Sequence, residues 1–210
     1  MSISNTKLIS ISKDAEKLIA YMARVSSNNQ DNPNIKGLLK YCIKHRHWSI
    51  FEMCNMVIEI NTTRAISAQI LRHRSFSFQE FSQRYAKVND LPNVPHLRLQ
   101  DHKNRQNSID GIDEELKIEL NKDIENLFND INKVYYKLLE NGVAKECARM
   151  VLPMCSPTRL YMSGSIRSWI HYLNVRCDES TQLEHRKIGL EIKEIFKQEL
   201  PILYEAVFQD

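Results

Sequence analysis

The sequence predicts an α+β fold: a single domain in which a small, mostly antiparallel sheet is packed by several helices, one of them long. Three observations support this prediction. Segments with helical periodicity cover most of the chain, and only two or three segments have the two-residue period of a strand. Strands and helices do not alternate regularly, as they would in a doubly wound parallel sheet. The length of 210 residues suits one domain, so we expect residues 1–210 to form a single domain.

The first part of the chain is expected to contain two helices followed by a strand. Residues 14–25 place apolar side chains on one helical stripe. Asn32 and Pro33 are typical of an N-cap and a first helical residue, which predicts a second helix that ends near His45. Residues 54–60 then place every second side chain on an apolar face, which is the period of a half-buried strand.

A short helix and a long loop are expected after this strand. Thr62 or Thr63 can cap a helix over residues 64–72, because a threonine hydroxyl accepts from a free N–H of the first helical turn. Residues 75–85 are aromatic and polar without a clean period. Residues 92–111 combine prolines with a polar stretch and predict a surface loop, and loops of this length are usually functional or mobile.

The second half of the chain is expected to be mainly helical. Its strongest signal is a long amphipathic helix over residues 113–141, with Gly142 placed as its C-terminal stop. The other expected elements are a short helix over residues 144–150, a strand over 158–163, helices over 165–175 and 180–199, and a short turn or helix that begins at Pro201.

The composition is that of an ordinary globular protein, with 42% hydrophobic and 26% charged residues. The net charge of +3 is too small to imply nucleic-acid binding by itself. No segment approaches the ~18 apolar residues of a membrane span, and residues 1–12 have no apolar run of signal-peptide length. We therefore expect neither a nucleic acid nor a membrane as a partner.

The cysteines indicate a reducing compartment. They are Cys42, Cys54, Cys147, Cys155 and Cys177. Their odd number, irregular spacing and lack of a C-x-x-C pair favour neither a disulfide framework nor a zinc site. Since free thiols persist in reducing compartments, we expect a cytoplasmic location.

The densest group of polar side chains combines guanidiniums, an imidazole and a hydroxyl. Its members are Gln69, Arg72, His73, Arg74, Glu80, Ser82 and Arg84. Arginine forks bind phosphate with paired hydrogen bonds, so the group favours an anion site in which Glu80 orients an arginine or accepts from a ligand. Gln69 and Arg72 would share a helix face if the helix continued that far. The alternative is a solvated basic helix end with the neighbouring phenylalanines in the core.

A second group lies on the expected helix over residues 165–175. Arg167, His171 and Asn174 follow each other at i, i+4 and i+7 and therefore share one face, while apolar side chains occupy the other. The polar face offers a row of ligand-binding groups, and Arg176 lies just past the helix end. The alternative, about equally compatible with the spacing, is a surface stripe that only solvates the helix.

Two further features carry weaker signals. His45 and His47 could ligate a metal, with Glu52 nearby, but no third His or Cys stands at a supporting spacing, so we expect no metal site. The ordinary alternative is a helix C-terminus that histidines stabilise. Arg149 is flanked by apolar residues and needs an anionic or polar partner if it is buried; otherwise it snorkels from a core helix. No Gly-rich phosphate loop or Rossmann fingerprint is present.

The most specific motif is Arg72-His73-Arg74, followed after seven residues by Ser82. It resembles the R-H-R-x7-S signature of flavin-dependent thymidylate synthases. Four more segments resemble the family's pattern in the same order, over nearly the whole chain: residues 23–26 (A-R-V-S), 44–52 (K-H-x-H…F-E), 148–153 (A-R-x-x-L-P) and the late helix over 167–176. Two departures are Ser165, where some members have Asn, and residues 154–157, which match no family pattern.

This resemblance implies an enzyme that binds FAD and methylates dUMP to dTMP. The implied carbon donor is methylenetetrahydrofolate, and NADPH reduces the flavin. No cysteine of the chain lies in a motif like that of the unrelated thymidylate synthase with a cysteine nucleophile, and the family is thought to need no protein nucleophile; the protein then binds, orients and stabilises charge. The family also implies a homotetramer with active sites shared between subunits.

The resemblance also implies roles by position. The positions implied to contact FAD are Ser49, Arg72, His73, Arg74, Glu80, Ser165, Ile166, Arg167 and His171, with His47 near the flavin and the folate. The positions implied for dUMP are Gln69, Ile70, Leu71, Arg72, Glu80, Phe81, Ser82, Gln83, Arg84, Arg149 and Arg176. Ser82 and Arg84 would hold the phosphate. Arg176 would contact the uracil ring and stabilise its negative charge, which is the catalytic role.

Two other function classes stay open at this point. A basic and aromatic nucleic-acid-binding module would use Arg72, Arg74 and Arg84 for phosphates and would bind oligonucleotides with a steep salt dependence. A metal-dependent hydrolase would use His45 and His47 and would contain stoichiometric zinc.

Overall fold

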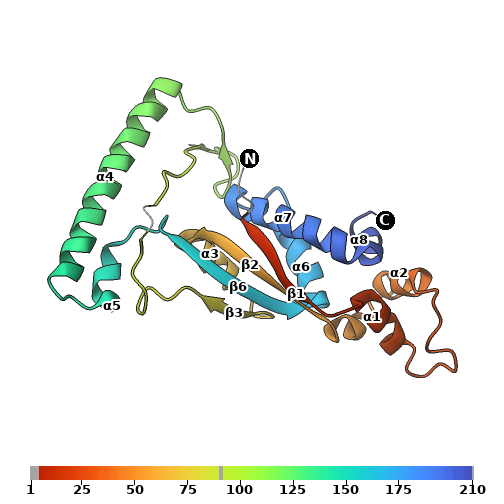
Figure 1. Cartoon of the computed structure of the whole chain (residues 1–210). Coiled ribbons are helices and arrows are strands. Elements are labelled where there is room, and N and C mark those ends of the chain that lie inside the picture. Colours follow the sequence, from red (N-terminus) through yellow and green to blue (C-terminus); the bar gives the residue numbers. More distant parts are fainter. Residues whose placement is uncertain (1–4, 90–91, 210) are drawn as a thin grey trace. The chain divides into compact units, whose positions relative to one another are not determined.

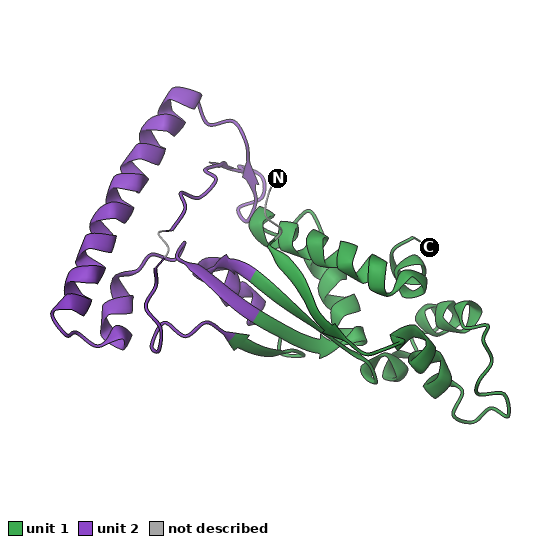
Figure 2. Ribbon diagram, viewed as in Figure 1, with its two compact units in different colours: residues 1–60, 73–79, 161–210 green, residues 61–72, 80–160 purple. Residues whose placement is uncertain are grey.

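The computed structural model describes residues 5–89 and 92–209. The chain forms two compact units, each assembled from separate stretches of sequence (Figure 1, Figure 2). Unit 1 comprises residues 1–60, 73–79 and 161–210, and unit 2 comprises residues 61–72 and 80–160. The predicted α+β fold, with a small antiparallel sheet and one long helix, is confirmed. In the described part of the chain no helix is both long and apolar enough to cross a membrane.

The sheet has four strands in the order β1-β2-β6-β3. Their bounds are β1 Thr6–Ile11, β2 Asn55–Thr63, β3 Ser77–Glu80 and β6 Pro157–Ser165. β1 and β2 are antiparallel, with Thr6 opposite Ile60. The strands predicted over residues 54–60 and 158–163 are confirmed as β2 and β6. β1 and β3 are additional, because both lie at the edges of the sheet, where a strand needs no continuous apolar face.

β2 forms as its alternating pattern predicts. Met56, Ile58 and Ile60 are fully buried, and Asn55 between Cys54 and Met56 is exposed. The indole Nε1 of Trp169 on α6 donates to the carbonyl of Met56 at 3.0 Å. The buried face of β2 therefore anchors the helix that carries the second polar group.

Unit 1 contains most of the helices. Their bounds are α1 Ala15–Ala23, α2 Lys36–Lys44, the 3-10 helix η1 Trp48–Glu52, α6 Ile166–Arg176, α7 Leu183–Glu199 and α8 Pro201–Phe208. All the predicted α-helices are present, and Pro201 opens α8 as expected. α7 begins three residues later than predicted, because the backbone N–H and the hydroxyl of Ser180 both donate to Asp178 and hold a turn.

The predicted capping role of Asn32 was wrong, since α2 begins only at Lys36. The guanidinium of Arg24 donates to the carbonyls of Asn32 and Asn34, at 2.5 and 2.6 Å. The side-chain oxygen of Asn32 accepts from the backbone N–H of Asn34 at 2.9 Å. These contacts fold the segment into a loop around Arg24, so the helix starts beyond it.

Unit 2 contains the long helix. Its helices are α3 Arg64–Ile70, α4 Glu114–Glu140, α5 Lys145–Ala148 and the 3-10 helix η2 Arg149–Val151. α4 matches its prediction: Asp113 accepts from two N–H groups of the first turn, and Gly142 follows the helix with φ +78°. Thr63 caps α3, as predicted. The unit's core includes Tyr135 on α4, whose hydroxyl accepts from the N–H of Val88 at 3.1 Å.

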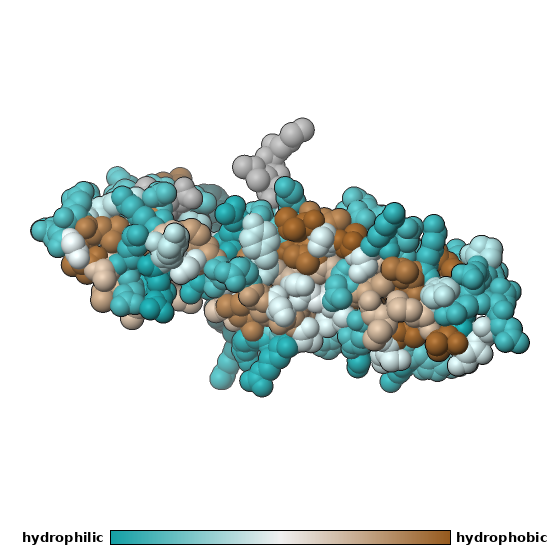
Figure 3. Space-filling view, turned by 60° about the horizontal axis from the view of Figure 1, so that its bottom comes forward, coloured by the Kyte–Doolittle hydropathy of each residue, from teal (hydrophilic) through white to brown (hydrophobic). Residues whose placement is uncertain are grey.

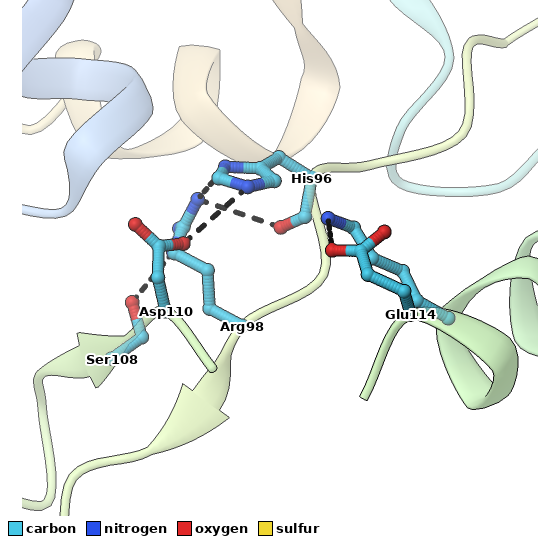
Figure 4. A network of polar contacts seen from close by, with 6 residues as sticks. His96, Arg98, Ser108, Asp110 and Glu114 are labelled. Carbon is cyan, nitrogen blue, oxygen red and sulfur yellow. Dashed lines mark hydrogen bonds and ion pairs between the residues drawn. The ribbon is translucent and has the colours of Figure 1, made fainter. Parts of the chain in front are cut away.

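The predicted surface loop over residues 92–111 is partly a hairpin. β4 Leu99–Gln100 pairs antiparallel with β5 Ser108–Ile109. Arg98 Nε donates to Ser108 Oγ at 2.7 Å, and His96 lies 3.4 Å from Asp110 (Figure 4). The turn between the strands is tied by Asp101, which accepts from backbone N–H groups inside it. Polar contacts rather than an apolar period hold this hairpin, which is why periodicity did not predict it.

Candidate functional site

A pocket of about 580 Å³ lies in unit 1. This volume is within the usual range of small-molecule sites, roughly 300–1,000 Å³. Arg167, His171 and Asn174 all line it, so the polar face predicted for α6 borders a real pocket. The remaining lining residues are Trp48, Glu52, Ser75, Ser168 and Ile170. The predicted apolar face of α6 is buried, which keeps the polar side chains on the pocket side.

Glu52, at the end of η1, fixes one wall of this pocket. Its Oε1 accepts from Arg167 Nη1 at 3.0 Å, and its Oε2 accepts from the hydroxyl of Ser165. Ser165 is also the N-cap of α6, since its Oγ accepts from the N–H of Ser168. One carboxylate therefore fixes both the start of α6 and the first pocket side chain on that helix. Sequence reasoning did not assign Glu52 to the site, although it noticed the residue in the F-E segment.

His73 and Arg176 meet in unit 1. Arg176 Nε donates to His73 Nε2 at 2.8 Å. Burial, together with the positive charge of Arg176 and the nearby His171, lowers the pKa of His73 to about 4. The imidazole is therefore neutral near pH 7, with its Nε2 lone pair used by Arg176. The sequence singled out both residues but did not predict this contact.

Tyr172 and His185 form a second buried pair beside His73. Tyr172 Oη and His185 Nε2 lie within hydrogen-bond distance, at 3.0 Å. The Tyr172 ring packs edge-on against the ring of His73, with 4.9 Å between centroids. Neither residue was predicted to be part of a site, because nothing in the local sequence distinguishes Tyr172 or His185 from ordinary core residues.

Unit 2 has its own polar centre at Glu80. A single oxygen, Oε1, lies 2.7 Å from Arg64 Nη1 and accepts from the hydroxyls of Ser67 and Thr158, at 2.6 and 2.9 Å. Glu80 was expected to orient an arginine or to accept from a ligand; the arginine that it pairs with is Arg64, which is not a member of the R-H-R motif. Arg64, Ser67 and Thr158 were not predicted as part of the site.

The other predicted residues of unit 2 differ in their exposure. Arg72 and Ser82 are exposed, and Arg84 forms an exposed ion pair with Glu146 at 3.0 Å. Gln83 is 6% exposed, and its Nε2 has no hydrogen-bond partner among the described residues. A buried amide donor of this kind is costly unless a ligand or water completes it.

Gln69 and Arg72 do not share a helix face, because the helix does not continue as far as Arg72. α3 ends at Ile70, and the N–H of Arg72 donates to the carbonyl of Gln69 in a closing turn at 3.4 Å. Helical spacing therefore does not apply to this pair, because the chain leaves the helix after Ile70.

The predicted positions divide between the two units. Unit 1 holds His47, Ser49, His73, Arg74, Ser165, Ile166, Arg167, His171 and Arg176. Unit 2 holds Gln69, Ile70, Leu71, Arg72, Glu80, Phe81, Ser82, Gln83, Arg84 and Arg149. Ile70 and Ile166 have fully buried side chains, so only their main chains are available to a ligand.

The histidines considered as metal ligands have aromatic neighbours instead. The ring of His45 packs on Tyr41 with 4.2 Å between centroids, and His47 meets Tyr41 edge-on. Across residues 5–89 and 92–209, no three His, Cys, Asp or Glu side chains are grouped as metal ligands.

The comparisons with known proteins agree on one family. The family model described as "Thymidylate synthase complementing protein" (Thy1) matches residues 7–202. A flavin-dependent thymidylate synthase of Synechocystis sp. is 54% identical, over 91% of this chain and 89% of the relative. A relative from Paramecium bursaria Chlorella virus 1 is 50% identical, over 97% of this chain and 98% of its own. The chain belongs to the flavin-dependent thymidylate synthase family.

A solved structure supports the fold assignment. The UMP/dUMP methylase PolB from Streptomyces cacaoi, bound with 5-Br dUMP, superposes with a TM-score of 0.82 at 24% identity. The superposition covers 96% of this chain and 93% of that chain. At this identity it shows a shared fold.

Family membership confirms three expectations drawn from the R-H-R-x7-S resemblance: the family, the thymidylate synthase activity and FAD as cofactor. The unit 1 pocket suits a flavin by its chemistry. A flavin is a flat heteroaromatic ring with carbonyl acceptors, and the pocket offers an indole, a guanidinium, an imidazole and an amide.

Proposed function

We propose that this flavin-dependent thymidylate synthase converts dUMP to dTMP with methylenetetrahydrofolate as carbon donor and NADPH as reductant. The observation that supports this most is the similarity to flavin-dependent thymidylate synthases along nearly the whole chain, signature included. When bound, reduced FAD would supply the hydride. The rest of the work falls to the protein, which binds, orients and stabilises charge.

For the flavin, we propose the pocket side chains and the R-H-R motif. Arg167 and His171 would hold the flavin together with Ser165 and the main chain of Ile166. The R-H-R motif would contribute Arg72, His73 and Arg74 to FAD binding. Glu80, Ser49 and His47 are the remaining residues that we propose to contact FAD. Glu52 supports the proposal, because it fixes the orientation of Arg167 before any ligand arrives.

For dUMP, we propose the residues of unit 2 together with Arg176. Ser82 and Arg84 would bind the phosphate, with Arg84 exchanging its exposed partner Glu146 for the nucleotide. The unpaired amide of Gln83 supports a polar ligand nearby. Main-chain groups of residues 69–72 and 80–84, with Arg149, would enclose the nucleotide. Arg176 would stabilise negative charge on the pyrimidine.

We further propose a homotetramer of one-domain subunits, in the cytoplasm, with shared active sites. α4 supports the oligomer, since Leu120, Leu127 and Val134 stand seven residues apart and are 37%, 57% and 49% exposed. A seven-residue apolar repeat on a helix is the pattern of a helix–helix seam. Exposed hydrophobic patches are also visible on the face of the molecule in Figure 3.

The oligomer proposal is tested by sedimentation velocity of matched variants. Leu127→Asp places a charge on the apolar repeat and should shift the protein to smaller species. Asn126→Asp adds the same charge beside it, at an exposed position off the repeat, and should not. A monomeric wild type, or a Leu127→Asp variant that sediments unchanged, would contradict a seam along α4.

The catalytic proposal is tested by the visible absorption spectrum of the purified protein with FAD, during a dUMP titration. A bound flavin spectrum that shifts with dUMP, together with NADPH- and folate-dependent dTMP formation, is the expected result. A protein that neither retains FAD nor responds to dUMP would overturn the proposal.

A further inference from the structure

The two helices α6 and α7 of unit 1 meet through two matched pairs of residues. Tyr172 and Arg176 stand four residues apart on α6, and His185 and Gly189 stand four residues apart on α7. Residues at this spacing share a helix face. Tyr172 faces His185, with 3.0 Å between Oη and Nε2. Gly189 faces the main chain of Arg176.

Gly189 allows an unusually close approach of the two helices. A Cβ at this position would lie 3.1 Å from the carbonyl oxygen of Arg176 and 3.2 Å from its carbonyl carbon. Both atoms belong to the backbone, so they cannot rotate away as a flexible side chain would. Glycine is among the poorest helix formers, yet it stands here inside a 17-residue helix at a buried position. The close contact between α6 and α7 explains why glycine occupies this position.

The second pair fixes the relative position of the helices through a directional contact. Tyr172 and His185 are both 0% exposed. Burial, followed by the positive charge of Arg176 and the nearby His73, lowers the pKa of His185 to about 3, and burial raises the pKa of Tyr172. Both groups are therefore neutral near pH 7 and can share one hydrogen bond. A hydrogen bond between rings sets the register of two helices more narrowly than apolar packing does.

The same stretch of α6 ends at Arg176. Its guanidinium donates to His73, while its own carbonyl rests against Gly189. The position of the Arg176 side chain is therefore set by two contacts: the hydrogen bond of its guanidinium to the His73 imidazole, and the packing of its main chain against α7. A carbonyl pushed outward by a methyl group would carry the guanidinium with it.

We propose that Gly189 and His185 are positioning residues for Arg176: α7 holds the end of α6 so that the Arg176 guanidinium meets His73. The link to catalysis rests on the role proposed above for Arg176. A displacement of about 1 Å at a reacting group can cost on the order of 100-fold in rate, so the smaller shift of a few tenths of an ångström that a Cβ at Gly189 demands should cost less. Neither Gly189 nor His185 is among the residues proposed to contact dUMP, so both would act through Arg176.

The decisive variant is Gly189→Ala, with Gly37→Ala as its matched control. Gly37 is also helical, in α2, but a Cβ there meets nothing within 4 Å. Each FAD-loaded variant is compared with the wild type by thermal unfolding, by kcat and KM for dUMP, and by NMR titration of the His73 ring. Gly189→Ala should lower kcat at least ~10-fold with a smaller effect on KM, because alignment rather than uniform binding is lost.

The His73 titration reports the position of Arg176 without reference to turnover. If Arg176 moves away, one of the charges that lower the pKa of His73 is withdrawn, and that pKa should rise in Gly189→Ala but not in Gly37→Ala. An unchanged titration and unchanged kcat in a folded Gly189→Ala protein would overturn the proposal. If instead Arg176→Ala retained full turnover, the catalytic role of Arg176 would fail, while the titration would still decide whether α7 positions it.

A second pair of variants covers the case in which Gly189→Ala does not fold. His185→Gln keeps a hydrogen-bonding group for Tyr172, and His185→Leu removes it at similar volume. The proposal predicts near-wild-type kcat for His185→Gln and a several-fold loss for His185→Leu, with the His73 pKa raised only in the second. Equal kcat and equal His73 titration in the two variants would overturn it.

Discussion

In unit 1 four candidate side chains are held by hydrogen bonds within the unit, whereas in unit 2 Arg72, Ser82 and Arg84 are exposed and one carboxylate, Glu80, is anchored. Glu52 holds both Ser165 and Arg167, and Arg176 holds His73. In unit 2 Glu80 is held by three partners, but Arg84 has only a solvent-exposed ion pair. Exposed ion pairs contribute little, roughly 0–1 kcal/mol. The comparison favours a preorganised group in unit 1 and an adaptable group in unit 2, the one proposed to bind the phosphate.

The largest effect is expected at Arg176. Arg176→Ala should lower turnover by about 10²–10³-fold, because loss of one preorganised donor to a developing charge has this effect. The fold should survive, since the side chain is only half-buried. Steady-state dTMP formation measures the loss, and Arg105→Ala on the exposed hairpin turn serves as control. Near-normal turnover would mean that the interlocked His73–Arg176 pair has a purely structural role.

If unit 2 binds dUMP and the unit 1 pocket binds FAD, a substitution in each unit should weaken the binding of a different ligand. Ser82→Ala should weaken dUMP binding by about 10-fold, the scale of one hydrogen bond to a charged group, with little change for FAD. Glu52→Ala should weaken FAD binding by only about 5-fold, since the Glu52–Arg167 pair is partly exposed, at 39% and 49%. Titration of the flavin spectrum gives both dissociation constants. The reverse order in either variant would mean that the ligands are assigned to the wrong residues.

Acid should lower the free energy of unfolding, because two histidines of unit 1 are neutral in the folded protein. Unfolded histidine titrates near pH 6.5, but the pKa of His185 is about 3 and that of His73 about 4 in the folded protein. Below pH 6.5 the unfolded chain therefore binds protons that the folded chain excludes, and stability falls as the pH drops toward 4. For the fully buried His185 the loss is about 2 kcal/mol at pH 5.

Urea denaturation at pH 7 and pH 5 measures this loss. His185→Gln cannot titrate and should remove the share of the pH dependence that belongs to His185. Exposed His102→Gln should leave the pH dependence as in the wild type. Identical pH dependence in wild type and His185→Gln would show that His185 has no abnormal titration.

Sequence reasoning succeeded where the signal was local. The caps of α4, Asp113 and Gly142, act within a few residues of the helix ends, so the sequence alone located this helix. The contact of Ser165 with Glu52 joins positions 113 residues apart, and that of Arg176 with His73 joins positions 103 apart. No periodicity or spacing rule reaches that far, which is why the side chains were singled out but their partners were not.

Motif resemblance and local pattern failed in different ways. The R-H-R-x7-S signature identified the family, yet it said nothing of Arg64, which turned out to pair with Glu80. The spacing of Gln69 and Arg72 suggested a shared helix face that the end of α3 removes. Periodicity therefore predicts an element better than it predicts where the element stops, because the stop depends on contacts outside the element.

The smallest effect is expected at Cys155, the cysteine within residues 154–157, the segment that matches no family pattern. Burial raises the pKa of its thiol, so little thiolate is present near pH 7, and a thiol is a poor nucleophile. Cys155→Ala should keep kcat within about 2-fold, since the proposed chemistry uses no protein nucleophile. Steady-state dTMP formation with thermal unfolding separates activity from folding, and exposed Cys147→Ala is the control. If Cys155→Ala were folded but inactive while Cys147→Ala stayed active, the result would indicate a catalytic thiolate at Cys155. Unit 2 would then take part in the chemistry as well as in nucleotide binding.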